Sequence, residues 1–356
     1  CCTRLCWKRS CGDYAVAVET RIIHPDQLEQ AVSLLRQGEC VAFPTETVYG
    51  LGADALNAEA VAKIFAAKQR PADNPLIVHI HSREQVAGLV KGYGQSVEIL
   101  MEQFWPGPLS LILPKGDIIP EIVSGGLDTV ALRMPDHDLA LKLLRKVDLP
   151  IAAPSANLSG SPSPTRAEHV YQDLNGRIPL ILDGGPTGWG VESTVLDCTC
   201  WPFRVLRPGG VTVEQLQQFV PIEVDSSVTG NSAVEQPRSP GMKYKHYSPR
   251  ADVILVVGNR VPEKINQLAS QPQYADLNIG VLAPSEHADL YPNLTVLDLG
   301  PRSQPKIAAS RLYHLLRTAD QIRLDAVFVE GFAEEDVGLA IMNRLRRAAG
   351  YKVVQS

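Results

Sequence analysis

The sequence lacks long hydrophobic runs and any strong excess of charge. No stretch approaches the roughly 20 uninterrupted apolar residues of a membrane-spanning helix, so we expect no membrane association. The formal net charge is −5, which excludes a general polycation for nucleic acid. Positive charge that binds phosphate must therefore be gathered locally. Because 45% of the residues are hydrophobic and 21% are charged, we expect a globular chain rather than a disordered or fibrous one.

Several catalytic signatures are also missing. The chain has no GxxxxGK[ST] phosphate loop, no HExxH zinc motif and no GxSxG nucleophile elbow. The eight histidines are dispersed, so no metal cage is visible. Gly50-x-Gly52-x-x-Ala55 matches a loose dinucleotide fingerprint, but no acidic residue follows at the right distance. A dinucleotide loop is therefore only a minor alternative for this segment.

Cysteine is sparse in the body of the chain. Four of the seven cysteines crowd the first eleven residues, and no second Cys/His cluster of matching spacing follows. We therefore favour an incidental terminal segment over a zinc site. Cys198 and Cys200 fall on a predicted strand and are interpreted as structural thiols. Such thiols indicate a reducing compartment, and we expect a cytoplasmic protein.

The length of 356 residues suggests two domains. Residues 1–20 start at Cys and lack the apolar core of a signal peptide, so we interpret them as a terminal extension such as a tag or a processed end. A first unit is expected over residues 21–221. Residues 222–250 are rich in Ser, Pro, Gly and Val and form the predicted linker. A second unit is expected over residues 251–356.

The first unit alternates short apolar strands with amphipathic helices. This pattern predicts an α/β domain built on a twisted mixed sheet. Asn57 is expected to cap one helix. Two capping boxes are also predicted, one pairing Ser82 with Gln85 and the other pairing Thr165 with Glu168.

The second unit repeats this alternation on a smaller scale. Strands are expected at 252–257 and 325–330, and helices at 261–269, 304–319 and 338–349. We therefore expect a smaller Rossmann-like α/β domain.

Two cations stand near an amide in Lys68-Gln-Arg70-Pro-Ala-Asp-Asn74-Pro75, at the end of a predicted helix. Lys is a compact charge and Arg a planar fork, so together they can clamp phosphate or carboxylate. The alternative is a helix end whose cations favour the dipole. The helix dipole explains why Lys and Arg stand at a helix end. It explains less well why the loop that carries these two cations is made rigid by two prolines.

A segment rich in small hydroxyl residues, 154–165, follows the hydrophobic strand 151–153. Hydroxyls and backbone amides at the carboxyl end of a strand are well placed to hold phosphate oxygens. No Cys, His or Asp adjoins Ser155 to activate it as a nucleophile, so we interpret these serines as hydrogen-bond donors to a ligand. A solvent-exposed Ser/Pro loop is the alternative that composition alone favours.

Further polar residues stand at the edges of predicted strands. Each of them, taken singly, is more often structural than functional. His79 alternates with apolar neighbours, and a core histidine is about as plausible as a ligand. The set is Thr45, Thr47, His79, Thr129, Arg133, Ser193, Thr194 and Arg207.

Seven segments, taken together and in order, resemble the YrdC-like domain. They are PTETVYGLGA (44–53), KQRPADNPLIVHI (68–80), WPGPL (105–109), GLDTVALRMP (126–135), IAAPSANLSGSPSPT (151–165), DGG (183–185) and GVESTVLD (190–197). PGMKYKHYSP (240–249) and GLAIMNRLRRAAG (338–350) resemble the linker and the last helix of the longer, two-domain type. The chain is thus similar to the L-threonylcarbamoyladenylate synthase family over residues 22–350. The joint occurrence of the motifs, rather than any single one, makes the resemblance specific.

The resemblance implies a nucleotidyltransferase with a concave cavity in its first domain. The family's reaction joins L-threonine, bicarbonate or CO₂, and ATP into L-threonylcarbamoyl-AMP and releases pyrophosphate. Downstream proteins then transfer the threonylcarbamoyl group to adenosine 37 of tRNA. Mg²⁺ is expected to be held mainly by ATP.

The resemblance also implies roles for individual residues. Lys68 and Arg70 would be catalytic and hold the ATP phosphates and the carbamate. The remaining ATP-binding residues would be Asn74, Thr129, Ser155, Asn157, Ser163, Arg207, Tyr244, His246 and Tyr247. The L-threonine-binding residues would be Thr45, His79, Arg133, Ala153 and Ser193, with Arg133 facing the substrate carboxylate.

Two other functions and one domain role complete the expectations. An RNA-binding module could use Lys68, Arg70 and Arg133, but the acidic balance argues against it and we expect no stable binding of nucleic acid. A carbamoyl-transferring hydrogenase-maturation protein has a similar domain, but its acylphosphatase and zinc-finger segments are not visible here. We expect the second unit to act mainly through the linker, which would close over the site and limit exchange.

Overall fold

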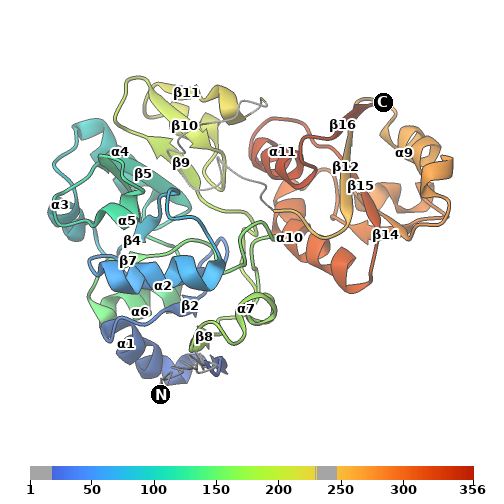
Figure 1. Ribbon diagram of the computed structural model, residues 1–356. Coiled ribbons are helices and arrows are strands. Elements are labelled where there is room, and N and C mark those ends of the chain that lie inside the picture. The colour runs from blue at the N-terminus through green and yellow to red at the C-terminus, as the bar shows by residue number, and fades with distance from the viewer. Residues whose placement is uncertain (1–17, 229, 231–246) are drawn as a thin grey trace, which may run out of the picture.

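The computed structural model describes residues 18–228, 230 and 247–356 (Figure 1). These residues form two α/β units that lie side by side, each around its own sheet. The first sheet has eleven strands and the second has five. This arrangement confirms the predicted fold class. Within the described residues, no helix is both long enough and apolar enough to span a bilayer.

The first sheet is mixed, with the strand order β1-β8-β2-β3-β7-β4-β6-β5-β9-β10-β11. For example, β4 and β6 run parallel, whereas β2 and β3 run antiparallel. The strands are β1 (Arg21–Ile23), β2 (Val41–Phe43), β3 (Gly50–Asp54), β4 (Ile77–His79), β5 (Leu109–Pro114), β6 (Thr129–Arg133), β7 (Ile151–Ala152), β8 (Leu180–Leu182), β9 (Thr194–Asp197), β10 (Phe203–Arg207) and β11 (Ile222–Val224). Because β11 pairs with β10, the segment expected to be linker begins inside this sheet. The domain boundaries drawn from the sequence stay a prediction.

Helices cover both faces of the first sheet. Apolar residues of α1 and α6 pack on one face, and those of α2, α4 and α7 pack on the other. The helices are α1 (Leu28–Arg36), α2 (Ala58–Lys68), α3 (Val86–Leu89), α4 (Gln95–Phe104), α5 (Glu121–Ser124), α6 (Asp138–Val147), α7 (Ala167–Leu174) and α8 (Val213–Gln217). Asn57 caps α2 as predicted, because its side chain accepts hydrogen bonds from the amides of Glu59 and Ala60.

Both predicted capping boxes are wrong. The Gln85 side chain instead accepts a hydrogen bond from the amide of His81, and Ser82 precedes only a short 3₁₀ turn. Helix α7 begins beyond Thr165, whose amide donates to Nδ1 of His169. In the first case the His81 amide takes the predicted acceptor, and in the second His169 takes the predicted donor, the Thr165 amide.

The bounds of β3 and β9 decide two further interpretations of the sequence, one for the Gly50–Ala55 pattern and one for Cys198 and Cys200. The Gly50–Ala55 pattern lies on β3, where a Cβ at Gly52 would come within 2.7 Å of the Phe43 ring and the Ile151 side chain. The glycine therefore serves close packing, and the dinucleotide loop is excluded. Cys198 and Cys200 follow β9, which ends at Asp197, so their placement on a strand was wrong.

The second sheet is all parallel, with the order β14-β13-β15-β12-β16, and confirms the Rossmann-like expectation. Its strands are β12 (Asp252–Val257), β13 (Ile279–Ala283), β14 (Thr295–Asp298), β15 (Ala326–Glu330) and β16 (Val353–Gln355). Its helices are α9 (Val261–Ala269), α10 (Pro305–Gln321) and α11 (Val337–Ala348). Helices α10 and α11 share a core with Val48 and Val191 of the first unit, so this face of the second unit is the domain interface.

The interface also carries polar contacts. Arg317 of α10 forms a buried ion pair with Asp173 of α7 at 2.8 Å, and the rings of His314 and His169 stack with centroids 5.4 Å apart. The two units are therefore held together by a mixed apolar and charged contact.

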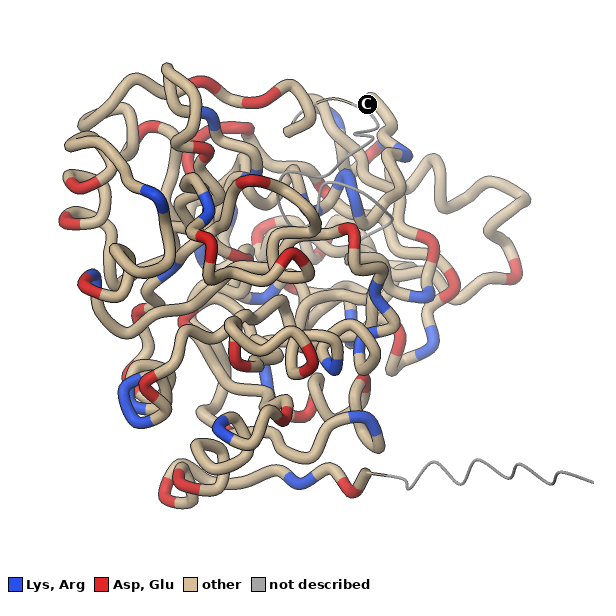
Figure 2. Tube along the Cα trace, turned by 60° about the vertical axis from the view of Figure 1, so that its left-hand side comes forward, with Lys and Arg blue, Asp and Glu red and all other residues tan. Residues whose placement is uncertain are grey.

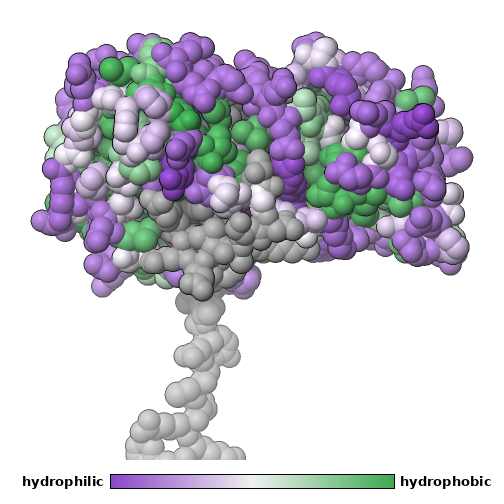
Figure 3. Space-filling view, turned by 90° about the horizontal axis from the view of Figure 1, so that it is seen from above, coloured by the Kyte–Doolittle hydropathy of each residue, from purple (hydrophilic) through white to green (hydrophobic). Residues whose placement is uncertain are grey.

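The face of the molecule seen from above carries many hydrophilic side chains, with apolar side chains gathered in patches on each unit (Figure 3).

Candidate active site

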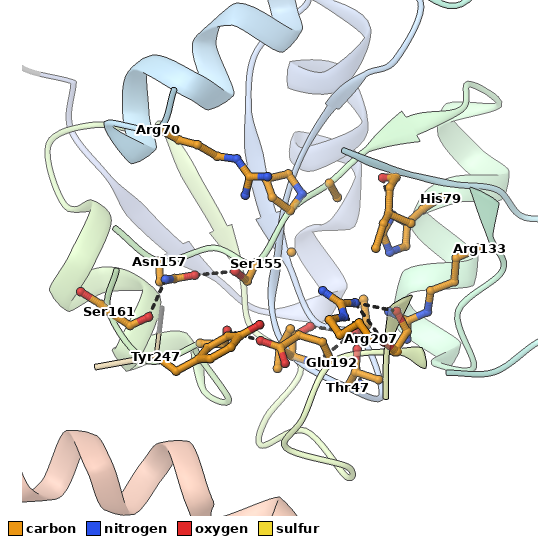
Figure 4. Close-up of a pocket in the computed structure, with 18 residues that line it drawn as sticks. Thr47, Arg70, His79, Arg133, Ser155, Asn157, Ser161, Glu192, Arg207 and Tyr247 are labelled. Atoms are coloured by element: carbon orange, nitrogen blue, oxygen red, sulfur yellow. Dashed lines mark hydrogen bonds between the residues drawn. The ribbon is translucent and has the colours of Figure 1, made fainter. Parts of the chain in front are cut away.

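One cavity collects most of the candidate residues (Figure 4). The strand pairing explains this, because His79 of β4 lies opposite Arg133 of β6, and Ser155 bridges to Gly50 of β3. Residues far apart in sequence thus reach the same end of the sheet. The expected site residues that line the cavity are Thr45, Arg70, His79, Arg133, Ala153, Ser155, Asn157, Ser163, Ser193, Arg207 and Tyr247.

Arg133 is buried at one side of this cavity. Its Nη2 lies 2.7 Å from Oε1 of Glu46, and its Nε donates to the Gly107 carbonyl at 3.3 Å. Only 4% of the Arg133 surface is exposed, so the guanidinium is held in place by these contacts. Sequence reasoning missed Glu46, although it lies inside the first quoted motif.

His79 faces the same space as Arg133. Burial, with the charge of Arg133 adding to it, lowers the pKa of His79 to about 3. Its Nδ1 is 3.2 Å from the Ile77 carbonyl oxygen, which suits a neutral ring with Nδ1 protonated. At neutral pH, His79 therefore brings a polar but uncharged group to the cavity.

Arg207 and Ser193 form a linked pair at the ends of β10 and β9. The Arg207 guanidinium donates from Nε and Nη2 to the Ser193 carbonyl, at 3.1 and 2.9 Å, and from Nη2 to the Ser193 hydroxyl at 3.2 Å. The Ser193 hydroxyl also lies 2.8 Å from that of Ser110. These bonds orient a cation and a hydroxyl toward one side of the cavity.

The segment rich in hydroxyl residues folds around Asn157. The Ser155 hydroxyl donates to Asn157 Oδ1 at 2.6 Å, and Asn157 Nδ2 donates to the Ser161 carbonyl at 2.9 Å. Asn157 and Ser163 are buried, with 5% and 0% of their surfaces exposed. The alternative of a solvent-exposed Ser/Pro loop is therefore excluded for these residues.

The side chains of Lys68 and Arg70 point in different directions at the end of α2. The reason is that Gln69, between them, adopts a left-handed conformation with φ of 51° and ends the helix. Lys68 lies outside the cavity lining and donates hydrogen bonds to the carbonyls of Ser155 and Asn157. Burial, with Arg70 nearby, lowers the pKa of Lys68 well below its usual range. Arg70 reaches the cavity and donates to the carbonyls of Asn74 and Pro75 at 3.2 Å.

Besides Lys68, four of the expected residues lie outside the cavity lining or outside the described residues. Asn74 is buried outside the lining, where its carbonyl supports Arg70. Thr129 also lies outside the lining, at the opposite end of β6 from Arg133. Tyr244 and His246 lie outside the described residues.

Tyr247 is the point where the linker segment reaches the cavity. It has a φ of 63° and only 5% of its surface is exposed. Its ring stacks on Tyr313 with centroids 5.3 Å apart and lies 5.4 Å from the Arg344 guanidinium. Because residues 231–246 lie outside the described residues, closure by the linker stays a prediction.

Glu192 is a charged lining residue to which sequence reasoning assigned no role. It accepts hydrogen bonds from Ser163, Tyr313 and Arg344, and burial acts to raise its pKa. The charges of Arg344 and Arg207 outweigh burial and lower the pKa of Glu192 to about 2. The signal in the sequence was its place in the 190–197 motif, but its partner Arg344 is 152 positions away.

The cavity does not fit a protein-built metal site. Glu192 is its one carboxylate lining residue and is already engaged by an arginine and two hydroxyls. Over the described residues, no group of three or more His, Cys, Asp and Glu could hold a metal ion. The donors present instead suit anions, since three arginines and several hydroxyls surround the space.

Comparisons with known proteins match both units. Residues 33–209 match a family described as "Telomere recombination", and residues 211–350 match one described as "Threonylcarbamoyl-AMP synthase, C-terminal domain". The chain is 52% identical over 331 residues to the threonylcarbamoyl-AMP synthase of Bacillus subtilis, covering 92% of this chain and 94% of that one.

Solved and shorter relatives add two observations. The crystal structure of Pyrococcus abyssi Sua5 complexed with L-threonine superposes with a TM-score of 0.88 at 45% identity, covering 95% of this chain and 99% of that one. A threonylcarbamoyl-AMP synthase of Vibrio parahaemolyticus is 36% identical over 186 residues, which is 52% of this chain but 100% of that one. Relatives with that name therefore exist both with and without a second unit.

Proposed function

The chain belongs to the threonylcarbamoyl-AMP synthase family and is an enzyme of the nucleotidyltransferase type, and we propose that its arginine-lined cavity holds ATP beside the carbamate of L-threonine. The product is threonylcarbamoyl-AMP. The observation that carries the proposal is the convergence of Arg70, Arg133 and Arg207 with buried hydroxyls on one cavity. Such a set of fixed cations suits two anionic reactants.

The reaction proposed for the cavity has two steps. Bicarbonate loses hydroxide to give CO₂, and the amine nitrogen of threonine bonds to its carbon. The proton released by the amine combines with that hydroxide to form water, and the product is a carbamate. A carbamate oxygen then bonds to the α-phosphorus of ATP while the bond to the leaving pyrophosphate breaks. Both reactants are anions, so the arginines offset their repulsion, and a shared cavity removes much of the entropic cost of bringing them together.

Individual roles follow from the chemistry of the lining. Arg133, held by Glu46, is proposed to bind the threonine carboxylate, with neutral His79, Thr45, Ala153 and Ser193 around the amino acid. Arg70, Ser155, Asn157, Ser163 and Arg207 are proposed to hold the nucleotide. Lys68 is proposed to act from outside the lining, by fixing the Ser155–Asn157 backbone. Asn74 and Thr129 keep only indirect roles.

The remaining components are also proposals. Mg²⁺ would enter with the phosphates of ATP, and no protein group is assigned to it. The product would pass to proteins that modify adenosine 37 of tRNA. A cytoplasmic location is supported by the unpaired thiols of Cys40 and Cys198, which suit a reducing compartment.

The RNA-binding alternative has little support. The curated relatives reported above are named as synthases. Figure 2 shows basic and acidic residues interspersed along the described chain rather than gathered by sign, whereas RNA binding favours a gathering of positive charge.

Pyrophosphate release from ATP tests the proposal. We expect release to require both L-threonine and bicarbonate, and omission of either to reduce it to background. Release that continues without threonine would remove the substrate assignment.

A further inference from the structure

Glu192 joins the two units at the wall of the cavity. The Ser163 hydroxyl donates to its Oε1 at 2.6 Å from the first unit. From the second unit, the Tyr313 hydroxyl donates to Oε2 at 2.9 Å and Arg344 Nε donates to Oε2 at 2.7 Å. One carboxylate is thus shared by the cavity and by helices α10 and α11.

A carboxylate in this position conflicts with the proposed ligands. The cavity is proposed to hold a triphosphate and a carbamate, and a bare negative charge in its wall would repel both. Glu192 and Arg207 line the same cavity, so a bare carboxylate would also compete with phosphate for the Arg207 guanidinium. The charge of Glu192 must therefore be compensated before the site can accept polyanions.

Arg344 is placed to neutralise the charge of Glu192. It is fully buried, and besides Glu192 it donates to Asn343 Oδ1 at 2.8 Å and to the Pro208 carbonyl at 3.0 Å. Pro208 directly follows Arg207, so Arg344 also supports the backbone that presents the cavity arginine. The Tyr247 ring covers the guanidinium from the cavity side.

We propose that Arg344 of the second unit is a positioning residue for ATP, because it neutralises Glu192 and leaves Arg207 available to phosphate. This inference rests on the proposed function and gives the second unit a direct role at the site, in addition to any action of the linker. The tight seating of α10 on the first unit supports it, since a Cβ at Gly190 would come within 2.4 Å of Ser310 Cα.

The test uses full-length variants and measures pyrophosphate release against ATP concentration. Arg344→Met should raise the KM for ATP by about tenfold or more, with a smaller effect on kcat. The double variant with Glu192→Gln should restore the KM to within about threefold of the parent, because the repelling charge is gone. Arg346→Met, on the same helix but paired with Glu334, is the control and should leave the KM unchanged.

The outcomes separate this inference from the proposed function. If the parent enzyme is active and the double variant is no better than Arg344→Met, the role of Arg344 is only structural and the inference is wrong. Glu192→Gln alone, with Arg344 intact, provides a second test should Arg344→Met fail to fold. It should lower the KM for ATP or leave it unchanged, and a tenfold rise would overturn the inference. Failure of the proposed function would instead show as no threonine-dependent release in the parent.

Discussion

Lys68 Nζ donates a hydrogen bond to the carbonyl oxygen of Asn157 at 2.6 Å, from behind the wall of the cavity. The same amine also donates to the Ser155 carbonyl. Lys68 thus holds the backbone of this segment, and the Ser155 hydroxyl donates to the Asn157 side chain within it. Lys68 was expected to touch substrate, and we propose instead that it acts through the residues that line the cavity.

Replacing Lys68 tests this relationship. Lys68→Met should reduce pyrophosphate release about 100-fold or more, because the segment that holds the nucleotide loses its fixed geometry. The free energy of unfolding should fall by only about 1–3 kcal/mol, since two carbonyls lose a donor while the cost of burying a polar amine is removed. Urea unfolding and steady-state kinetics measure the two effects.

A matched control lies on the same helix. Lys63 is partly exposed and pairs with Glu39 at 2.6 Å. Lys63→Met should change the free energy of unfolding by less than about 1 kcal/mol and leave turnover intact. Equal losses of turnover in both variants would contradict a specific role for Lys68.

Arg133 should govern the affinity for threonine rather than for ATP. Arg133→Lys keeps a charge for the buried Glu46 but loses the planar fork that binds a carboxylate in two places. We expect the KM for threonine to rise by about tenfold and the KM for ATP to change by less than about threefold. Arg145→Lys, at an exposed position of α6, is the control. A rise in the KM for ATP as large as that for threonine would remove this assignment.

Stability should fall as the pH is lowered from neutral. Burial, with Arg317 and His314 adding to it, lowers the pKa of His169 to about 3, whereas an unfolded histidine titrates near 6.5. Between these two pKa values the unfolded chain binds a proton that the folded chain does not bind, so lowering the pH favours unfolding. His79 acts in the same direction. Each buried histidine should lower the free energy of unfolding by up to about 1.4 kcal/mol per pH unit below 6.5.

Urea unfolding at pH 7.5 and 5.5 measures this dependence. His169→Gln should reduce the loss of stability between the two pH values, because the amide does not titrate. His24→Gln is the control, since the side chain of His24 is 78% exposed. The same pH dependence in the parent and in His169→Gln would show that this ring is not the source.

Gly190 should control the contact between the units. It has a φ of 72°, and an added Cβ would lie 2.4 Å from Ser310 Cα of α10. Gly176 has a φ of 77° with nothing within 4 Å of its Cβ position, so it is a matched control for backbone strain alone. Both alanine variants should lose about 1–2 kcal/mol from the left-handed conformation. Only Gly190→Ala should increase hydrogen exchange in residues 305–321 and raise the KM for ATP, and equal behaviour of the two would contradict this contact.

The sequence predicted the elements better than their ends. The helix expected at 261–269 and the strand expected at 252–257 occur as stated, because their apolar periodicity is matched by burial. The capping boxes failed since His81 and His169 compete for the same local polar groups. Periodicity reports burial, whereas a cap depends on individual hydrogen bonds.

Some residues of the candidate site could likewise be predicted from the sequence, and others could not. Arg133, His79 and Ser155 were found because the ends of neighbouring strands meet, which a sequence pattern can indicate. The orientation of Lys68 was not, because it depends on the left-handed Gln69 that follows it. Glu46 and Glu192 were missed because their arginine partners are distant in sequence and one of them belongs to the other unit.

A crystal structure with L-threonine and a non-hydrolysable ATP analogue tests the central claim most directly. We expect both ligands in the one cavity, with the threonine carboxylate on Arg133 and the phosphates beside Arg70 and Arg207. Ligands bound in separate hollows, or phosphates away from both of these arginines, would contradict the account.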